Sequence, residues 1–154
     1  MLPFDAEDFE DTSERNMEIV GLGTDIVECL RIRKMIDEHG EQFLRRVFTT
    51  REIRYCQSRR HSTEHFAGRW AAKEAVLKAL GTGWRRGISW TDIEIRNDPT
   101  GQPRVAVQGE AKEIAKKMRL QDLMITISHC RQFATAYAIA VRKDGPAKRK
   151  TRPK

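Results

Sequence analysis

The chain has 154 residues, 39% of them hydrophobic and 33% charged, which predicts one globular domain with its own core. It contains no run of about 18 apolar residues and no N-terminal secretory signal, which argues against membrane-spanning and secreted proteins. The three cysteines, Cys29, Cys56 and Cys130, follow no paired metal-binding spacing, so we expect reduced thiols in a cytoplasmic protein.

The net charge of +7 is distributed unevenly along the chain. Residues 1–16 carry −5, residues 142–154 carry +6, and the body between them carries +6. Both ends lack apolar periodicity, so we predict an acidic disordered extension over 1–16, a domain over 17–141 and a basic disordered tail over 142–154. A basic body attracts nucleic acid, acidic proteins or phosphorylated small molecules, and charge alone does not choose among these.

The domain begins with a predicted buried strand, MEIVGLGTDIVEC, over residues 17–29. Its apolar residues are expected to be buried: Ile19, Val20, Leu22, Ile26 and Val27. Gly21 and Gly23 would let another backbone or a ligand approach the strand closely. Asp25 stands in this apolar company, where a turn or bulge residue and a ligand-binding residue are equally good interpretations.

Three short helical segments are predicted next. Residues 30–39 form a helix that Gly40 ends, residues 41–48 add another turn or two, and the Thr49–Glu52 capping box begins a helix that runs to about Gln57. These segments carry several arginines, among them Arg31, Arg45 and Arg46. They form either a solvated face or a docking surface for an acidic partner.

A longer helix with an acidic residue beside its apolar side is predicted over residues 66–80, ended by Gly81. The apolar side is expected to face the core and consists of Phe66, Trp70, Leu77 and Leu80. Glu74 lies at the edge of this side, where a half-buried carboxylate needs a compensating cation. An i,i+4 ion pair with Lys78 is one account, and a bound metal ion is the other. The helix alone favours the ion pair.

The rest of the chain predicts a hairpin, a helix and two strands. The glycine-rich loop 81–87 precedes strands over 88–95 and 104–107, and a helix follows over about 111–118. A half-buried strand over 123–128 places His129 at its end, and the last strand, 133–141, has alanines that permit close packing of a helix or subunit. The order β-α-α-α-β-β-α-β-β predicts a single small α+β domain with a largely antiparallel sheet.

Three stretches together resemble the holo-[acyl-carrier-protein] synthases, which are small 4′-phosphopantetheinyl transferases. They are GLGTDIVECLRI (residues 21–32), FAGRWAAKEAVLKALGTG (66–83, followed by ISWTDIEI) and ITISHCRQFATAYAIAV (125–141). The resemblance covers about residues 17–141 and implies a 4′-phosphopantetheinyl transferase-like fold. It implies transfer of 4′-phosphopantetheine from coenzyme A to a serine of apo acyl carrier protein, with Mg²⁺ as cofactor and 3′,5′-ADP as the released product.

The resemblance also implies roles for individual residues. Asp25 and Glu74 match the metal-binding carboxylates, since Mg²⁺ takes oxygen ligands and is held by one or two carboxylates plus phosphate oxygens. Lys78 would reach the phosphate or the reacting hydroxyl. Glu74, or a metal-bound water beside it, is the leading candidate for the base that takes the serine proton, and His129 is the alternative.

Coenzyme A phosphates and the carrier protein are expected to meet further basic groups. Arg69 and His129 match family positions that contact coenzyme A, and Gly81, Gly83 and Arg85 of the glycine-rich loop would border the nucleotide. The family resemblance makes Arg31 a carrier-docking residue, to which Arg45 and Arg46 are added because acyl carrier proteins are acidic.

The resemblance further implies a homotrimer whose active sites lie between subunits, with Asp25 of one chain facing helix residues of a neighbour. The alternative function is a small basic nucleic-acid-binding protein, which would explain the net charge but not two carboxylates inside apolar motifs. The sequence does not indicate which carrier protein is preferred.

Overall fold

The computed structural model describes residues 17–84 and 87–143. In chain order the elements are β1 (Met17–Glu28), α1 (Cys29–Val47), α2 (Thr50–Gln57), α3 (Ser62–Leu80), the 3₁₀ helix η2 (Trp90–Asp92), β2 (Ile93–Asn97), β3 (Pro103–Val107), α4 (Gly109–Lys117), β4 (Leu120–His129) and β5 (Phe133–Lys143). The predicted order of helices and strands is confirmed. The acidic extension 1–16 and residues 144–154 of the predicted tail lie outside the described residues, whereas Arg142 and Lys143, predicted as the start of that tail, belong to β5.

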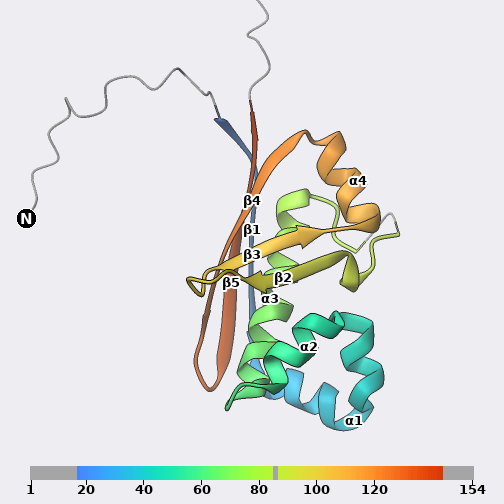
Figure 1. The fold of residues 1–154 in the computed structure, drawn as a ribbon, viewed down its shortest axis with the longest axis vertical. Coiled ribbons are helices and arrows are strands. Elements are labelled where there is room, and N and C mark those ends of the chain that lie inside the picture. Colours follow the sequence, from blue (N-terminus) through green and yellow to red (C-terminus); the bar gives the residue numbers. More distant parts are fainter. Residues whose placement is uncertain (1–16, 85–86, 144–154) are drawn as a thin grey trace, which may run out of the picture.

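All the strand pairs are antiparallel, as predicted, but they form two sheets rather than one. One has three strands in the order β1-β5-β4, and the other is the β2-β3 hairpin. Helices α1 to α4 all lie to the same side of the three-stranded sheet (Figure 1). Within the described ranges, none of the helices has the length and apolar character that crossing a membrane requires.

Local signals in the sequence predicted the boundaries of the first helices correctly. Gly40 has a φ of +54° and interrupts α1 with a kink, and Thr49 and Glu52 form the predicted capping box at the start of α2. Gly81 ends α3 in the left-handed conformation with a φ of +72°. The first hairpin strand is shorter than the predicted range 88–95, because residues 90–92 form η2 before β2 begins.

The predicted core-facing side is confirmed for Phe66, Leu77 and Leu80, but helix α3 is buried on nearly every other side as well. It contacts all three strands of the large sheet on one side, and α1, α2 and β2 on others. From Phe66 to Leu80, only Trp70 and Glu74 are half-buried and only Lys78 is exposed. A helix that packs against other elements on all sides has no single apolar face. The sequence pattern therefore identified only part of its buried surface.

The backbones of α3 and β1 approach each other so closely that only glycine fits between them. A Cβ atom on Gly21 would lie 1.9 Å from the carbonyl oxygen of Ala79, and one on Gly23 would lie 1.9 Å from that of Ala75. Strand β5 presents four fully buried alanines to the interior: Ala134, Ala136, Ala138 and Ala140. The close approach predicted from these small residues is therefore confirmed.

The apolar residues of β1 are mostly exposed, which contradicts the prediction of a buried strand. Ile19, Leu22 and Ile26 are each about two-thirds exposed, at 66%, 68% and 67%. Successive side chains of a strand point to opposite faces, and α3 covers only the face that carries Gly21, Gly23 and Val27. Neighbouring strands add further exposed apolar side chains, namely Met124, Phe133 and Tyr137. We call this set, with Leu22 and Ile26, the open apolar face.

We expect Gly23→Ala to lower the free energy of unfolding by about 3 kcal/mol, since the new methyl group meets backbone atoms that no side-chain rotation can move. Chemical denaturation followed by circular dichroism would measure it. Thr24→Ala, at an exposed position of the same strand, is the control and should change stability by less than about 0.5 kcal/mol. Equal effects of the two substitutions would contradict a backbone clash.

Candidate active site

The partly open stripe of α3 carries two of the predicted site residues. Trp70, Glu74 and Lys78 follow one another at four-residue spacing and therefore lie along one line of the helix surface. Apart from this line, every residue between Phe66 and Leu80 is buried. Glu74 and Lys78 are thus the charged side chains that this part of α3 offers to solvent.

Strand β1 brings Asp25 to the same place. Asp25 pairs with Ala136 in a regular part of the strand, so it is not a bulge residue, and the register shift of β1 lies earlier, between Ile19 and Gly21. Its carboxylate Oδ1 lies 3.1 Å from Lys78 Nζ, which also donates to the carbonyl oxygen of Thr24 at 2.7 Å. The Asp25 side chain is 17% exposed, so this ion pair is partly shielded from water. The contact forms within one chain.

Glu74 is held by an indole rather than by Lys78. Trp84 Nε1 donates a hydrogen bond to Glu74 Oε1 at 3.1 Å. The i,i+4 ion pair that the helix alone favoured is therefore not the contact that compensates Glu74. Lys78 pairs with Asp25 instead, and Glu74 lies one helical turn before Lys78 on the same stripe. We call Asp25, Glu74 and Lys78 the acidic cluster.

Three tryptophans stack beside this cluster. The ring centroids of Trp84 and Trp90 are 3.7 Å apart, and those of Trp90 and Trp70 are 4.3 Å apart. The Arg31 guanidinium carbon lies 5.9 Å from the Trp70 ring centroid. Nothing in the sequence marks this stack, because its members come from α3, the following loop and η2.

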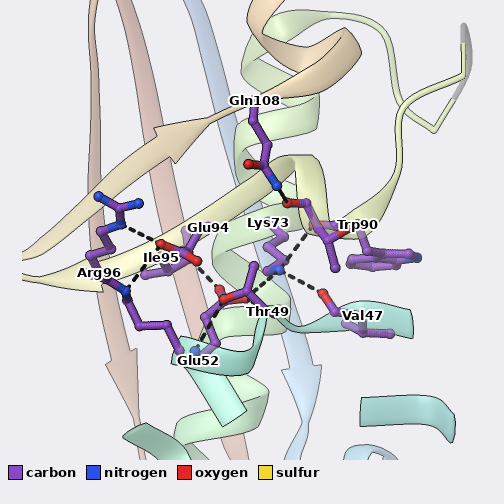
Figure 2. A network of polar contacts seen from close by, with 11 residues as sticks. Val47, Thr49, Glu52, Lys73, Trp90, Glu94, Ile95, Arg96 and Gln108 are labelled. Atoms are coloured by element: carbon purple, nitrogen blue, oxygen red, sulfur yellow. Dashed lines mark hydrogen bonds and ion pairs between the residues drawn. The ribbon is translucent and has the colours of Figure 1, made fainter. Parts of the chain in front are cut away.

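A buried ion pair lies next to Trp90 (Figure 2). Lys73 and Glu52 are both fully buried, and Lys73 Nζ donates to Glu52 Oε2 at 2.8 Å. The other Lys73 donations go to the carbonyl oxygens of Val47 at 2.7 Å and Trp90 at 3.1 Å. Glu52 Oε1 accepts from the backbone N–H of Ile95 at 2.9 Å. Burial lowers the pKa of Lys73, and the charge of Glu52 opposes that shift.

Besides β2, which Glu52 reaches through Ile95, the pair joins four parts of the chain and fixes the position of Trp90. Its bonds reach the end of α1, the start of α2, the middle of α3 and the backbone of η2. All three ammonium protons of Lys73 are used. The sequence predicts Glu52 only as part of the capping box and indicates no role for Lys73.

His129, the last residue of β4, lies beside the N-terminal end of α3, and Arg69 lies within α3, five residues before Glu74. Arg69 is 4% exposed, donates to Asn97 Oδ1 at 2.7 Å and stacks on Tyr55 at 3.9 Å. Its buried Nε atom has no partner among the described residues. His129 Nδ1 lies 3.1 Å from Glu64 Oε2, and the ring of His129 is 5.0 Å from that of His65.

The positive charge of this second group affects the pKa of His65. Burial lowers the pKa of His65, and the charges of His129 and Arg69 lower it further. Glu64, the partner of His129, precedes Glu74 by ten residues, which is about 15 Å along an α-helix. One chain therefore does not bring His129 to the acidic cluster.

The other predicted site residues lie on exposed parts of the chain. Gly81 and Gly83 follow α3 with φ values of +72° and +56°, and Arg85 lies outside the described residues. Arg31, Arg45 and Arg46 are all exposed on α1, and Arg45 pairs with Glu41 at 3.1 Å. Of these docking candidates, Arg31 contacts the tryptophan stack, whereas Arg45 and Arg46 lie beyond the kink at Gly40.

The chemistry of the acidic cluster suits a hard divalent cation. Asp25 and Glu74 supply carboxylate oxygens, and Lys78 already places a positive charge against Asp25. The described ranges hold no group of three or more His, Cys, Asp or Glu side chains arranged for a metal ion. Two carboxylates fit Mg²⁺, which fills its remaining coordination positions with waters and substrate phosphate oxygens.

Comparison with known proteins identifies the family. The model of the 4′-phosphopantetheinyl transferase superfamily matches residues 21–141. A holo-[acyl-carrier-protein] synthase of Rhodopirellula baltica is 48% identical over 123 residues, which span 80% of this chain and 98% of that protein.

Two solved structures with bound ligands have the same fold. The holo-(acyl-carrier-protein) synthase of Bacillus anthracis in complex with CoA (3′,5′-ADP) is 37% identical, with a TM-score of 0.67, and the match covers 81% of this chain and 98% of that one. The Helicobacter pylori synthase in complex with coenzyme A is 33% identical, with a TM-score of 0.69 and coverage of 77% and 98%. Sequence and fold agree over most of the chain, which therefore belongs to the holo-[acyl-carrier-protein] synthase family of phosphopantetheinyl transferases.

Proposed function

We propose that this enzyme transfers 4′-phosphopantetheine from coenzyme A to a serine hydroxyl of apo acyl carrier protein, depends on Mg²⁺ and releases 3′,5′-ADP. The observation that carries the proposal is the acidic cluster, in which Asp25 and Lys78 meet 3.1 Å apart beside Glu74. The names of the relatives support the carrier protein as acceptor. The coenzyme A and 3′,5′-ADP bound to the solved relatives support the donor and the product.

Asp25 and Glu74 would hold the Mg²⁺ ion. A magnesium ion supplies positive charge to phosphate oxygens and neutralises negative charge that develops on them during transfer. The residue types fit this role, because both side chains offer oxygen donors and Glu74 keeps one carboxylate oxygen without an indole bond.

The side chains of the protein would position the reactants and accept the proton of the serine hydroxyl. The serine oxygen attacks the phosphorus that bears the pantetheine arm, and the bond from that phosphorus to 3′,5′-ADP breaks. The Lys78 ammonium, 52% exposed, stabilises charge on the phosphate oxygens. Glu74, or a water held beside it, takes the serine proton, and His129 is the alternative base.

His129 would serve the active site of another subunit. Within one chain His129 lies with Glu64 and His65, about 15 Å along α3 from Glu74. A homotrimer in which the open apolar face is covered would unite this basic group with a neighbour's acidic cluster. Because Asp25 contacts Lys78 of its own chain, we propose that the neighbour supplies His129 rather than Asp25, and that Arg69 keeps its proposed contact with coenzyme A phosphates.

The basic body of the protein supports an acidic carrier as partner. Arg31 is exposed over Trp70, the first residue of the open stripe that leads to Glu74. A carrier helix docked there would bring its serine toward the acidic cluster, and complementary charge would raise the association rate. The glycine-rich loop with Gly81, Gly83 and Arg85 would border the nucleotide. Family membership favours this partner over nucleic acid, the alternative that the charge left open.

We expect the protein to add phosphopantetheine to apo acyl carrier protein when coenzyme A and Mg²⁺ are present, as measured by intact-protein mass spectrometry. Glu74→Gln should lower kcat by at least about 100-fold, because it removes both a charged ligand and the candidate base. Glu113→Gln, at an exposed position of α4, is the matched control and should retain activity. Near-normal turnover of Glu74→Gln with an unchanged unfolding temperature would exclude this metal site.

Reversing the charge of Arg31 should weaken carrier docking alone. We expect Arg31→Glu to raise KM for the carrier about tenfold, which corresponds to about 1.4 kcal/mol, and to leave KM for coenzyme A unchanged. Lys112→Glu reverses a charge on α4 and should change neither constant. A larger change in KM for coenzyme A would assign Arg31 to the nucleotide instead of the carrier.

A charge on the open apolar face should dissociate the trimer. Leu22 is 68% exposed in the single chain, so Leu22→Asp should leave the subunit folded but shift the mass in sedimentation equilibrium from trimer to monomer. Thr100→Asp, in the hairpin turn, should stay trimeric.

Mixing inactive Glu74→Gln and His129→Ala subunits should restore part of the activity. A fully active monomer, or mixed trimers without activity, would refute the shared site.

A further inference from the structure

We propose that Trp84 is a positioning residue for the active site, whose indole N–H fixes the orientation of the Glu74 carboxylate for metal binding. This inference rests on the proposed role of Glu74. It adds a residue of the loop after α3 to the site and gives the tryptophan stack a function. The stack would act as a rigid support for one hydrogen bond.

The bond between Trp84 and Glu74 constrains a side chain that is otherwise loosely held. Glu74 lies on the partly open stripe of α3, where a glutamate has several accessible rotamers. Among the described residues, the Trp84 indole is its one hydrogen-bond partner, with Nε1 3.1 Å from Oε1. An indole N–H can only donate, so it engages one carboxylate oxygen and leaves the other directed elsewhere.

The support behind Trp84 reaches into the protein core. Trp84 stacks on Trp90 at 3.7 Å, and Trp90 stacks on Trp70 at 4.3 Å. The carbonyl oxygen of Trp90 accepts a hydrogen bond from the fully buried Lys73 at 3.1 Å. A loop residue is thus tied to the centre of the molecule through ring contacts and one buried ammonium group.

This arrangement links two neighbouring positions of the same helical stripe. Trp70 and Glu74 are four residues apart on α3, and the column of three rings leads from one to the other through the loop and η2. A carboxylate held in place before the ion arrives loses less rotamer freedom on binding. Groups that hydrogen-bond a metal ligand commonly change metal affinity by about 10–100-fold when they are removed.

The test removes the N–H while keeping an aromatic ring. Mn²⁺, an Mg²⁺ analogue that is visible by electron paramagnetic resonance, is titrated into the full-length protein with and without coenzyme A. We expect Trp84→Phe to raise the Mn²⁺ dissociation constant about tenfold. It should also raise the Mg²⁺ concentration for half-maximal activity, while kcat at saturating Mg²⁺ and the unfolding temperature change little.

Two matched variants separate the hydrogen bond from the ring. Trp70→Phe removes an indole from the other end of the stack and should leave the Mn²⁺ dissociation constant within about twofold of wild type. Replacing the Trp84 indole by a benzothiophene amino acid keeps the bicyclic shape without the N–H, and should reproduce the loss seen in Trp84→Phe. Equal shifts in Trp70→Phe and Trp84→Phe would overturn the proposal, as would a benzothiophene variant that binds Mn²⁺ normally.

The outcome also distinguishes this inference from the proposed function. A wild-type protein that binds no Mn²⁺ and transfers no phosphopantetheine would overturn both. A wild-type protein that binds Mn²⁺ and is active, with a Trp84→Phe variant of equal affinity, would overturn the positioning role of Trp84 alone.

Discussion

The contact between the backbones of α3 and β1 determines where the rest of the molecule lies. Gly21 and Gly23 have room for no side chain, since a Cβ atom would lie 1.9 Å from a helix carbonyl oxygen. The same spacing places Asp25, two residues after Gly23, within 3.1 Å of Lys78. A wider separation would leave this lysine without its carboxylate. The acidic cluster is therefore a direct consequence of how deeply the helix packs on the sheet.

The buried ion pair of Lys73 and Glu52 also fixes the position of neighbouring elements, on the other side of α3. Two buried charges lose their hydration, and their attraction offsets that cost only when the remaining hydrogen-bonding groups are satisfied. Here Lys73 uses all three protons, and Glu52 also caps α2 and accepts from Ile95. Removing either partner would leave an uncompensated charge in the core. The pair thus ties α1, α2 and η2 to the helix that carries Glu74.

Features that depend on a few neighbouring residues could be predicted from the sequence. Features that depend on how the helices pack on the sheet could not. The Thr49 capping box, the break at Gly40 and the close approach at Gly23 follow from local chemistry, and all three are present. The exposure of Leu22 and the burial of α3 on nearly all sides depend on which sheet face the helices cover. The hydrogen-bond partner of Glu74 is Trp84, and no local sequence pattern connects these two residues. Family resemblance, rather than periodicity, selected Asp25 and Glu74 together.

The separation of two charged groups along α3 explains why a single subunit is an incomplete enzyme in our proposal. The acidic cluster has carboxylates and one lysine, whereas the group around His129 and Arg69 has basic side chains suited to phosphate. Along the helix, Glu64, the partner of His129, is about 15 Å from Glu74, too far for His129 and Glu74 to touch one phosphate, whereas Arg69 is about 7.5 Å from Glu74. The sheet between them exposes Leu22, Ile26 and Tyr137, an apolar surface that a stable monomer rarely presents to water. Covering that surface with a second copy would bury the apolar side chains and, in the same step, bring the basic group of one chain to the carboxylates of the next.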